Sequence, residues 1–339
     1  MQFIYSVGLL AFVALATGCN PSSPGDSPKT PLPLGTVDSP EFPVESRSSA
    51  PYVVVLGVAQ DAGYPQAGCQ RDCCRRVWRD PSLRGYAACL AIIDPLSQQR
   101  WMLECTPDFR EQLQLSDRLA PVKSESGTSD LNGILLTHAH IGHYSGLIHL
   151  GHEAMGASGI PVYAMPRMIE FLRTSGPWSQ LVAFQNIELR SLADQQTIVL
   201  NDRIRITPLL VPHRDEFSET VGFRIEGPQH SVLFLPDIDK WDRWNVRVED
   251  VLGTVDRAYV DGTFFADGEL PHRSMDQIPH PFIVESIARF APLSTSERDK
   301  IRFLHFNHTN PAHDPNSDAV KTIRAAGHDI ARRGETFSL

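Results

Sequence analysis

The sequence predicts a layered α/β domain built from two β-sheets with helices packed on their outer faces. Short apolar runs of roughly four to eight residues recur along the chain and are bounded by Gly, Pro, Asn or Asp, as expected of strands. Helix-like stretches lie between some of these runs, and no internal repeat is present. Together these observations favour a single layered domain over residues 52–339.

The elements follow one another along this domain from "YVVVLGVAQ" near its start to "PNSDAVKTIRAAGHDIARR" near its end. The expected strands cover residues 52–60, 88–95, 100–107, 132–138, 160–165, 196–200, 203–211, 222–227, 230–237, 257–265 and 301–308. The expected helices cover residues 141–157, 165–176, 280–292 and 315–333.

The composition restricts the class of protein and its partners. The chain has 339 residues, a formal net charge of −9 and 42% hydrophobic residues, which is ordinary for a soluble globular protein. The acidic balance argues against nucleic acid as a partner, because a surface that binds phosphates usually shows a basic excess. We therefore expect a small-molecule substrate.

The N-terminal segment is expected to lie outside this domain. Residues 1–19 form a short apolar run that ends in "ATGC", which reads as a secretory signal and resembles a bacterial lipobox with Cys19 as the lipidated residue. A plain cleavable signal, or an apolar start that is retained, is the alternative. Residues 20–51 are rich in Pro, Ser and Gly and predict an extended tether. The expected product is an exported lipoprotein, held at a membrane by its acyl chains.

Several expected strands end in a residue that can bind a metal or move a proton. These residues are His138, His213, Asp237, Asp261 and His305. Functional residues of layered α/β folds usually lie at strand ends, so the presence of these five residues at strand ends indicates one shared site.

Three histidines lie within six positions in "GILLTHAHIGHYSGL". His138 and His140 are two residues apart just after a strand, and His143 follows at the start of an expected helix. Neutral imidazole is a common ligand of zinc and related metals, so this cluster predicts a catalytic metal site with an open position for water. Hydrogen-bonded loop histidines are the alternative.

The motifs resemble the metallo-β-lactamase superfamily in order and spacing. "THAHIGHYSG" is similar to its first metal motif, "VPHRDE" to its single-histidine motif, "LFLPDID" to its bridging-aspartate motif and "FLHFNHTNP" to its closing motif. Within the superfamily, "GYPQAGC", "WMLECTPDF", "DGTF" and "HFNHTNP" resemble the branch of coenzyme PQQ synthesis protein B. The resemblance implies an αββα sandwich with a metal cleft at one edge. It also implies six metal ligands: His138, His140, His143, His213, Asp237 and His305.

One departure concerns the second metal position. The superfamily places an aspartate where this chain has Gly142, which leaves His143, His305 and the shared Asp237 on that side. We therefore expect one zinc ion, and a filled second position only if another residue such as Glu153 or Asp239 supplies the carboxylate. On this reasoning, Gly142→Asp is expected to raise the metal content.

A cysteine cluster predicts a separate structural zinc site. "GCQRDCC" contains Cys69, Cys73 and Cys74, and three thiolates with one histidine suit a closed zinc site. In the related carbon–phosphorus lyase phosphodiesterase, a histidine three residues after the closing motif histidine completes such a cluster, and His308 holds that place here. Disulfides are the alternative in an exported protein.

The resemblance also suggests catalytic roles and leaves the reaction open. His280 lies in a region where the tRNase Z branch has a histidine that assists proton transfer; a residue at a helix start without a catalytic role is the alternative. Asp237 would take up a proton in a metal-dependent hydrolysis of an ester, phosphodiester or related bond. The alternatives are an iron-dependent oxidative enzyme related to PQQ biosynthesis and a non-catalytic metal-binding accessory lipoprotein.

Overall fold

The computed structural model describes residues 49–119, 131–270 and 274–339, all of which lie in one compact unit. The expected signal at 1–19, its Cys19 and nearly all of the expected tether at 20–51 fall outside the described residues. Within the described ranges, no helix combines the length and the apolar character needed to cross a membrane.

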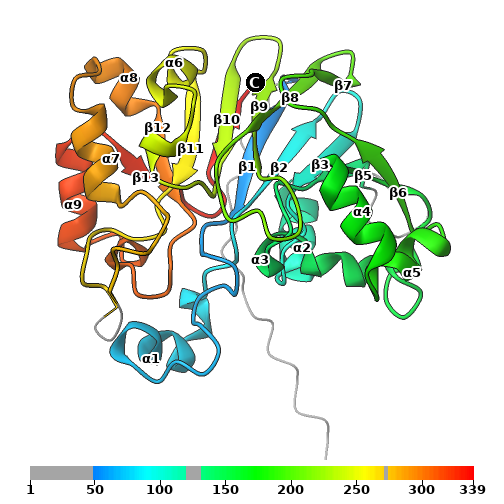
Figure 1. The fold of residues 1–339 in the computed structure, drawn as a ribbon, viewed down its shortest axis with the longest axis horizontal. Helices are drawn as coiled ribbons and strands as arrows, with labels where there is room; N and C mark the ends of the chain where they lie inside the picture. The colour runs from blue at the N-terminus through cyan, green and yellow to red at the C-terminus, as the bar shows by residue number, and fades with distance from the viewer. Residues whose placement is uncertain (1–48, 120–130, 271–273) are drawn as a thin grey trace, which may run out of the picture. The chain divides into compact units, whose positions relative to one another are not determined.

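Two seven-stranded mixed sheets form the centre of the unit (Figure 1). The first sheet has the order β14 (Thr336–Ser338), β1 (Tyr52–Gly57), β2 (Cys89–Asp94), β3 (Gln99–Leu103), β4 (Gly133–Leu135), β5 (Ile160–Ala164) and β6 (Ile187–Ser191). The second has the order β13 (Asp329–Ile330), β12 (Ile301–Leu304), β11 (Arg257–Asp261), β10 (Ser231–Leu235), β9 (Val221–Glu226), β8 (Ile204–Leu210) and β7 (Ile198–Asn201).

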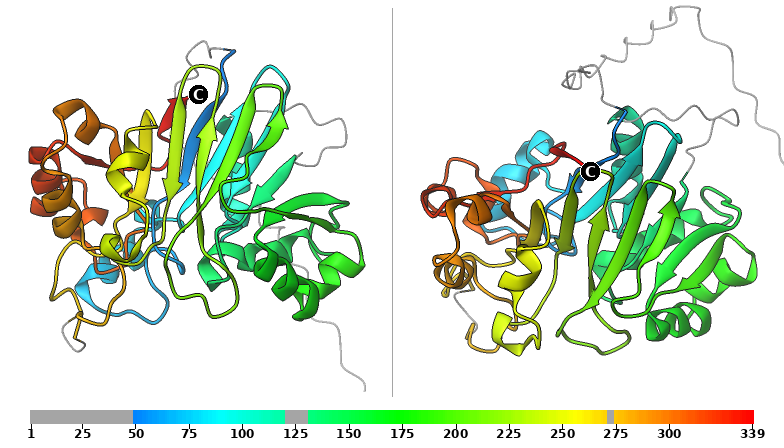
Figure 2. Two further views of the ribbon diagram at one scale, coloured as in Figure 1. Left: turned by 45° about the horizontal axis from the view of Figure 1, so that its top comes forward. Right: turned by 90° about the horizontal axis from the view of Figure 1, so that it is seen from above.

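Helices cover the outer faces of both sheets. Figures 1 and 2 show α7 and α9 on one side of the unit and α4 and α5 on the other. The α-helices are α1 (Asp72–Arg79), α2 (Phe109–Leu119), α3 (Ile141–Tyr144), α4 (Pro166–Thr174), α5 (Trp178–Ala183), α6 (Val248–Leu252), α7 (Ile283–Phe290), α8 (Thr295–Asp299) and α9 (Asp318–Ala325). Short 3₁₀ segments are η1 (Pro81–Leu83), η2 (Ser145–Leu150), η3 (Trp241–Arg243) and η4 (Pro311–His313).

The alternation of side chains along β1 shows how the layers are filled. Val53 and Val55 belong to the apolar core between the two sheets. Val54 and Leu56 point to the opposite face and pack in the core beneath the helices of the first sheet. A strand covered on both faces is apolar at every position, which is why "VVVL" is a continuous run. The expected αββα sandwich is therefore confirmed.

The helix expected over 141–157 is wrong in its extent. Only α3 is α-helical; η2 follows, and turns replace the rest. The segment hydrogen-bonds across to the loop after β3 instead of to itself, because Cys105 N–H donates to the His143 carbonyl and Gly146 N–H donates to the Cys105 carbonyl. A Cβ on Gly146 would lie 2.1 Å from the Thr106 carbonyl oxygen, so glycine permits this close approach.

Candidate metal centre

The ends of parallel strands bring the predicted metal ligands to one edge of the sandwich. β4 runs parallel to β3 and β5, and β10, β11 and β12 run parallel to one another. His138 follows β4, Asp237 follows β10 and His305 comes directly after β12. Parallel strands end at a common edge, so residues far apart in the sequence meet there.

Four of the predicted ligands form a first group, in which one ligand atom from each residue lies within 4.8 Å of the others: His138, His140, His213 and Asp237. His138 Nε2 lies 2.8 Å from His140 Nδ1 and 3.4 Å from Asp237 Oδ2. His213 Nε2 lies 3.3 Å from the same carboxylate oxygen. These distances fit ligand atoms arranged around a single cation.

The other two predicted ligands form a second group with a residue that the sequence motifs do not mark. His143 Nε2 lies 3.1 Å from Asp61 Oδ1, and His305 Nε2 lies 3.6 Å from it. Asp237 Oδ2 is 3.7 Å from His143 Nε2 and 4.0 Å from His305 Nε2. The Asp237 carboxylate therefore lies between the two groups, as expected of a bridging residue.

Several buried ligand atoms have no hydrogen-bond partner, which tests whether these residues fit a metal. The unpartnered atoms include Nε2 of His143, His213 and His305 and Oδ1 of Asp61 and Asp237. Buried polar atoms are nearly always satisfied, and a set left unsatisfied at one place indicates a missing partner. A divalent cation accepts imidazole nitrogen and carboxylate oxygen together, so the donor set fits zinc or iron.

Outer residues orient the imidazoles. The Nδ1 atom of His143 lies 3.3 Å from Glu104 Oε1, and Glu104 is completely buried. Metal-binding histidines commonly use their second nitrogen in this way, which fixes the ring orientation. The contact between His143 and Glu104 is an ion-pair contact, and neither atom has a hydrogen-bond partner. The Nδ1 atoms of the other histidines are hydrogen-bonded: that of His138 to Thr137 Oγ1 (2.8 Å), that of His213 to Asp239 Oδ1 (3.2 Å) and that of His305 to Thr263 Oγ1 (2.9 Å).

The local charges are strongly coupled. Burial opposes the charged form of His143, but the carboxylates of Glu104 and Asp61 outweigh it and raise its pKa well above the ordinary value. Burial likewise opposes ionisation of Asp237, yet its pKa is held well below the usual range by the imidazoles of His213, His280 and others. Buried carboxylates in this number require compensating positive charge, which imidazolium groups or a cation supply.

The other predicted catalytic residue, His280, reaches the same edge from the segment just before α7. Its Nδ1 lies 2.9 Å from Asp261 Oδ2 and 3.1 Å from Asp237 Oδ1. Asp261 is completely buried and also accepts hydrogen bonds from the backbone N–H and hydroxyl of Thr263. His280 is therefore hydrogen-bonded to Asp261 and lies beside the Asp237 carboxylate of the first group.

The two residues suggested as replacements for the missing carboxylate lie elsewhere. Asp239 Oδ1 contacts Nδ1 of His213, the ligand of the first group, and its Oδ2 accepts a hydrogen bond from Arg243. Glu153 lines a separate pocket. A carboxylate from outside the histidine motif does lie at the second group, but it is that of Asp61 and not that of Glu153 or Asp239. No motif or spacing marks Asp61, since it comes from a turn about 80 residues before His143.

The predicted cysteine cluster is assembled by α1, the turn before it and the loop after β12. One ligand atom from each of Cys69, Cys73, Cys74 and His308 lies within 4.8 Å of the others. Cys74 Sγ is 3.3 Å and Cys73 Sγ 3.7 Å from His308 Nδ1, and Cys69 Sγ is 3.7 Å from Cys73 Sγ. All three thiols are free in the structure, so the disulfide alternative is not the arrangement seen. Burial and neighbouring thiols raise the pKa of Cys74 to about 12.

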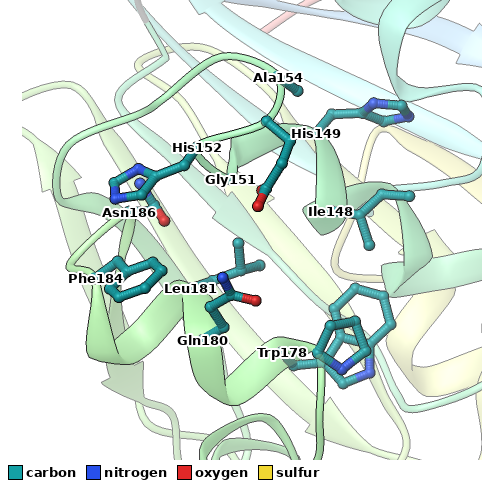
Figure 3. A pocket seen from close by; sticks show the side chains of 12 residues that line it. Ile148, His149, Gly151, His152, Ala154, Trp178, Gln180, Leu181, Phe184 and Asn186 are labelled. Carbon is teal, nitrogen blue, oxygen red and sulfur yellow. The ribbon is translucent and has the colours of Figure 1, made fainter. Parts of the chain in front are cut away.

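A further pocket of about 420 Å³ lies beside η2 and α5 (Figure 3). Trp178, Leu181 and Phe184 form its apolar wall, and the His152 ring stacks on Phe184 with ring centroids 4.6 Å apart. No residue of the two histidine groups lines this pocket. It is therefore distinct from the metal centre.

Comparison with known proteins agrees with this geometry. The family model for the beta-lactamase superfamily domain matches residues 99–329. Coenzyme PQQ synthesis protein B of Xanthomonas campestris pv. campestris is 27% identical over 313 residues, covering 85% of this chain and 99% of that protein. The protein of the same name from Methylorubrum extorquens is 23% identical over 313 residues, covering 85% of this chain and 100% of that protein.

Solved structures show the same fold. The crystal structure of Zn²⁺-bound PqqB from Methylobacterium extorquens has a TM-score of 0.71 at 23% identity, covering 85% of this chain and 100% of that one. A diphosphatase of the PhnP family has a TM-score of 0.60 at 20% identity, covering 85% and 97%. The chain therefore belongs to the metallo-β-lactamase superfamily and is similar along most of its length to coenzyme PQQ synthesis protein B.

Proposed function

We propose that this protein is a metal-dependent hydrolase with zinc held by the first group. The observation that carries the proposal is the convergence of three imidazoles and the Asp237 carboxylate at the strand edge, with the buried His213 Nε2 left unpartnered. A zinc ion bound there would lower the pKa of a water molecule and polarise a carbonyl or phosphoryl oxygen.

Two residues of the chain would carry out the proton transfers of the hydrolysis. The Oδ2 atom of Asp237 faces both histidine groups, and the Asp237 carboxylate would accept the proton released when water attacks the substrate. His280 has its Nδ1 engaged by Asp261 and Asp237, which leaves Nε2 as the ring nitrogen available to transfer a proton to a leaving group. The substrate would be a small molecule with an ester, phosphodiester or related bond.

A second candidate function is an iron-dependent oxidation. The relatives carry the name coenzyme PQQ synthesis protein B, and a site of imidazoles with few carboxylates suits iron as well as zinc. In this case the same residues would hold the ion, and hydrolysis would be absent.

The test combines metal identity with a substrate panel. Protein purified without added metal is analysed by mass spectrometry for metals and assayed with bis(4-nitrophenyl) phosphate, 4-nitrophenyl acetate and nitrocefin. The hydrolase proposal expects zinc and turnover of at least one ester or amide, lost in His138→Ala and kept in His230→Ala, whose side chain is exposed and outside the site. Iron without hydrolysis would favour the oxidative function, and metal without either reaction an accessory role.

We further propose that Cys69, Cys73, Cys74 and His308 hold a structural zinc ion. Their clustering joins α1 to the loop after β12, two segments more than 230 residues apart in the chain. A closed site of three thiolates and one imidazole is a typical structural zinc environment, and binding would stabilise the fold directly. The localisation proposed from residues 1–19 is export with a lipid anchor at Cys19.

A further inference from the structure

Gly142 leaves a space that another residue fills. A Cβ at position 142 would lie 2.2 Å from the Asp61 Cα, 2.6 Å from its Oδ1 and 2.7 Å from its Cβ. Gly142 is in α3 and is not among the glycines with positive φ, so backbone conformation does not require glycine there. The requirement is steric: any side chain at position 142 would collide with Asp61.

The Cα, Cβ and Oδ1 atoms of Asp61 fill this space, and its carboxylate points to the second histidine group. Its Oδ1 is buried without a hydrogen-bond partner, 3.1 Å from His143 Nε2 and 3.6 Å from His305 Nε2. Both of these nitrogens are also unpartnered, on residues that are 1% and 0% exposed. Three unsatisfied ligand atoms on separate segments of the chain therefore face one another.

The backbone around Asp61 is attached to the strand end that carries His305. Gln60 N–H donates to the Phe306 carbonyl at 2.8 Å, and Ala59 forms β-bridges with Phe306 and Ala87. The two residues that precede Asp61 are thereby attached to Phe306, the neighbour of the predicted ligand His305. This attachment places the backbone of the turn that carries Asp61 beside the end of β12.

We propose that Asp61 is the carboxylate ligand of a second metal position, together with His143, His305 and the shared Asp237, and that Gly142 is the space which this exchange requires. The proposal rests on metal binding at the first group, as proposed above. It expects two ions at the edge of the sandwich, where the sequence motif alone expects one. In the superfamily motif the carboxylate comes from within the histidine motif, whereas here Asp61 would supply it from the turn after β1.

The test measures how many zinc ions the wild-type protein and its substitution variants bind per chain. Wild-type protein is loaded with Zn²⁺, desalted and analysed for zinc per chain, together with the variants Asp61→Asn and Gly142→Asp. Asp61→Asn keeps the shape of the side chain and is expected to lose one ion. Gly142→Asp is expected to be destabilised by the collision. Shortening residue 61 would not relieve this collision, because a Cβ at position 142 would lie 2.2 Å from the Cα of residue 61, which every amino acid retains.

The outcomes separate this inference from the proposal on which it rests. Two edge ions in folded Asp61→Asn would overturn the ligand role of Asp61, whether or not the other variants fold. An unfolding temperature of Gly142→Asp equal to that of the wild type would overturn the steric role assigned to Gly142. The variant His138→Ala is expected to lose the first ion, and a wild-type chain with zinc only at the cysteine cluster would refute both proposals. The zinc-induced rise in unfolding temperature gives a second readout that does not depend on activity.

Discussion

Replacing the buried carboxylate of Glu104 by an amide tests how the second histidine group is oriented. Glu104 is completely buried; its Oε1 lies 3.3 Å from His143 Nδ1, and its Oε2 accepts a hydrogen bond from the Thr137 N–H at 3.4 Å. In Glu104→Gln, one of these two contacts must meet an amide N–H₂ instead of an oxygen. Either the Thr137 N–H faces another donor, or His143 must change the nitrogen that carries its proton.

The expected losses of metal affinity and of folding stability in Glu104→Gln follow from these two contacts. Losing an outer partner of a metal-binding histidine typically weakens metal binding 10- to 100-fold, which is about 1.4 to 2.7 kcal/mol. One buried polar group left without a partner costs about 1–3 kcal/mol of folding free energy. The backbone of Glu104 makes protein stability more sensitive to this substitution. Glu104 has φ = 81°, a conformation that non-glycine residues adopt only when the surroundings impose it.

The assay measures zinc affinity by competition with a chelator and stability by thermal unfolding, with Glu111→Gln as the matched control. Glu111 is on α2, its side chain is 40% exposed, and it pairs with Arg110 on the surface, so its change is expected to stay within about 0.5 kcal/mol. A folded Glu104→Gln protein with unchanged affinity for both edge ions would refute the orienting role of Glu104.

Three further predictions concern other parts of the chain. Cys73→Ser is expected to release one zinc ion per chain and lower the unfolding temperature, whereas Cys89→Ser, at a buried thiol outside the cluster, keeps the zinc; equal zinc content in both would contradict the structural site. Cys19→Ser is expected to move the expressed protein from the membrane fraction to the soluble fraction, and an unchanged distribution would contradict the lipid anchor. Burial lowers the pKa of His313 to about 4 from 6.5. The unfolded chain therefore binds this proton first as the pH falls, so stability is expected to drop by up to about 3 kcal/mol between pH 6.5 and 4, and chemical denaturation of His313→Gln is expected to show a correspondingly smaller loss.

The layered fold was predictable because its signals are local. Runs such as "YVVVLG" and "SVLFL" are apolar throughout since both faces of a central strand are buried, and the observed β1 and β10 lie within the expected ranges. Short edge elements were missed, including β6, β13 and β14, because an edge strand carries a weak pattern and is defined by its neighbour. The helix expected from residue 141 was too long, since hydrogen bonds to Cys105 end it and no local pattern reports them.

The sequence by itself determined the first metal group, the cysteine cluster and the edge at which the site would form. His138 and His140, and likewise Cys69, Cys73 and Cys74, are close together in the sequence, so these parts of the two groups are visible before folding. The partners from other segments, such as His213 and His308, were indicated by the family motifs. Only the tertiary structure decided what completes the second group. Asp61 and Glu104 come from the turn after β1 and the end of β3, and they meet His143 because the sheet places those strand ends beside α3. In the sequence, glycine at position 142 indicates an absent ligand, whereas in the folded chain it leaves room for the backbone and side chain of Asp61.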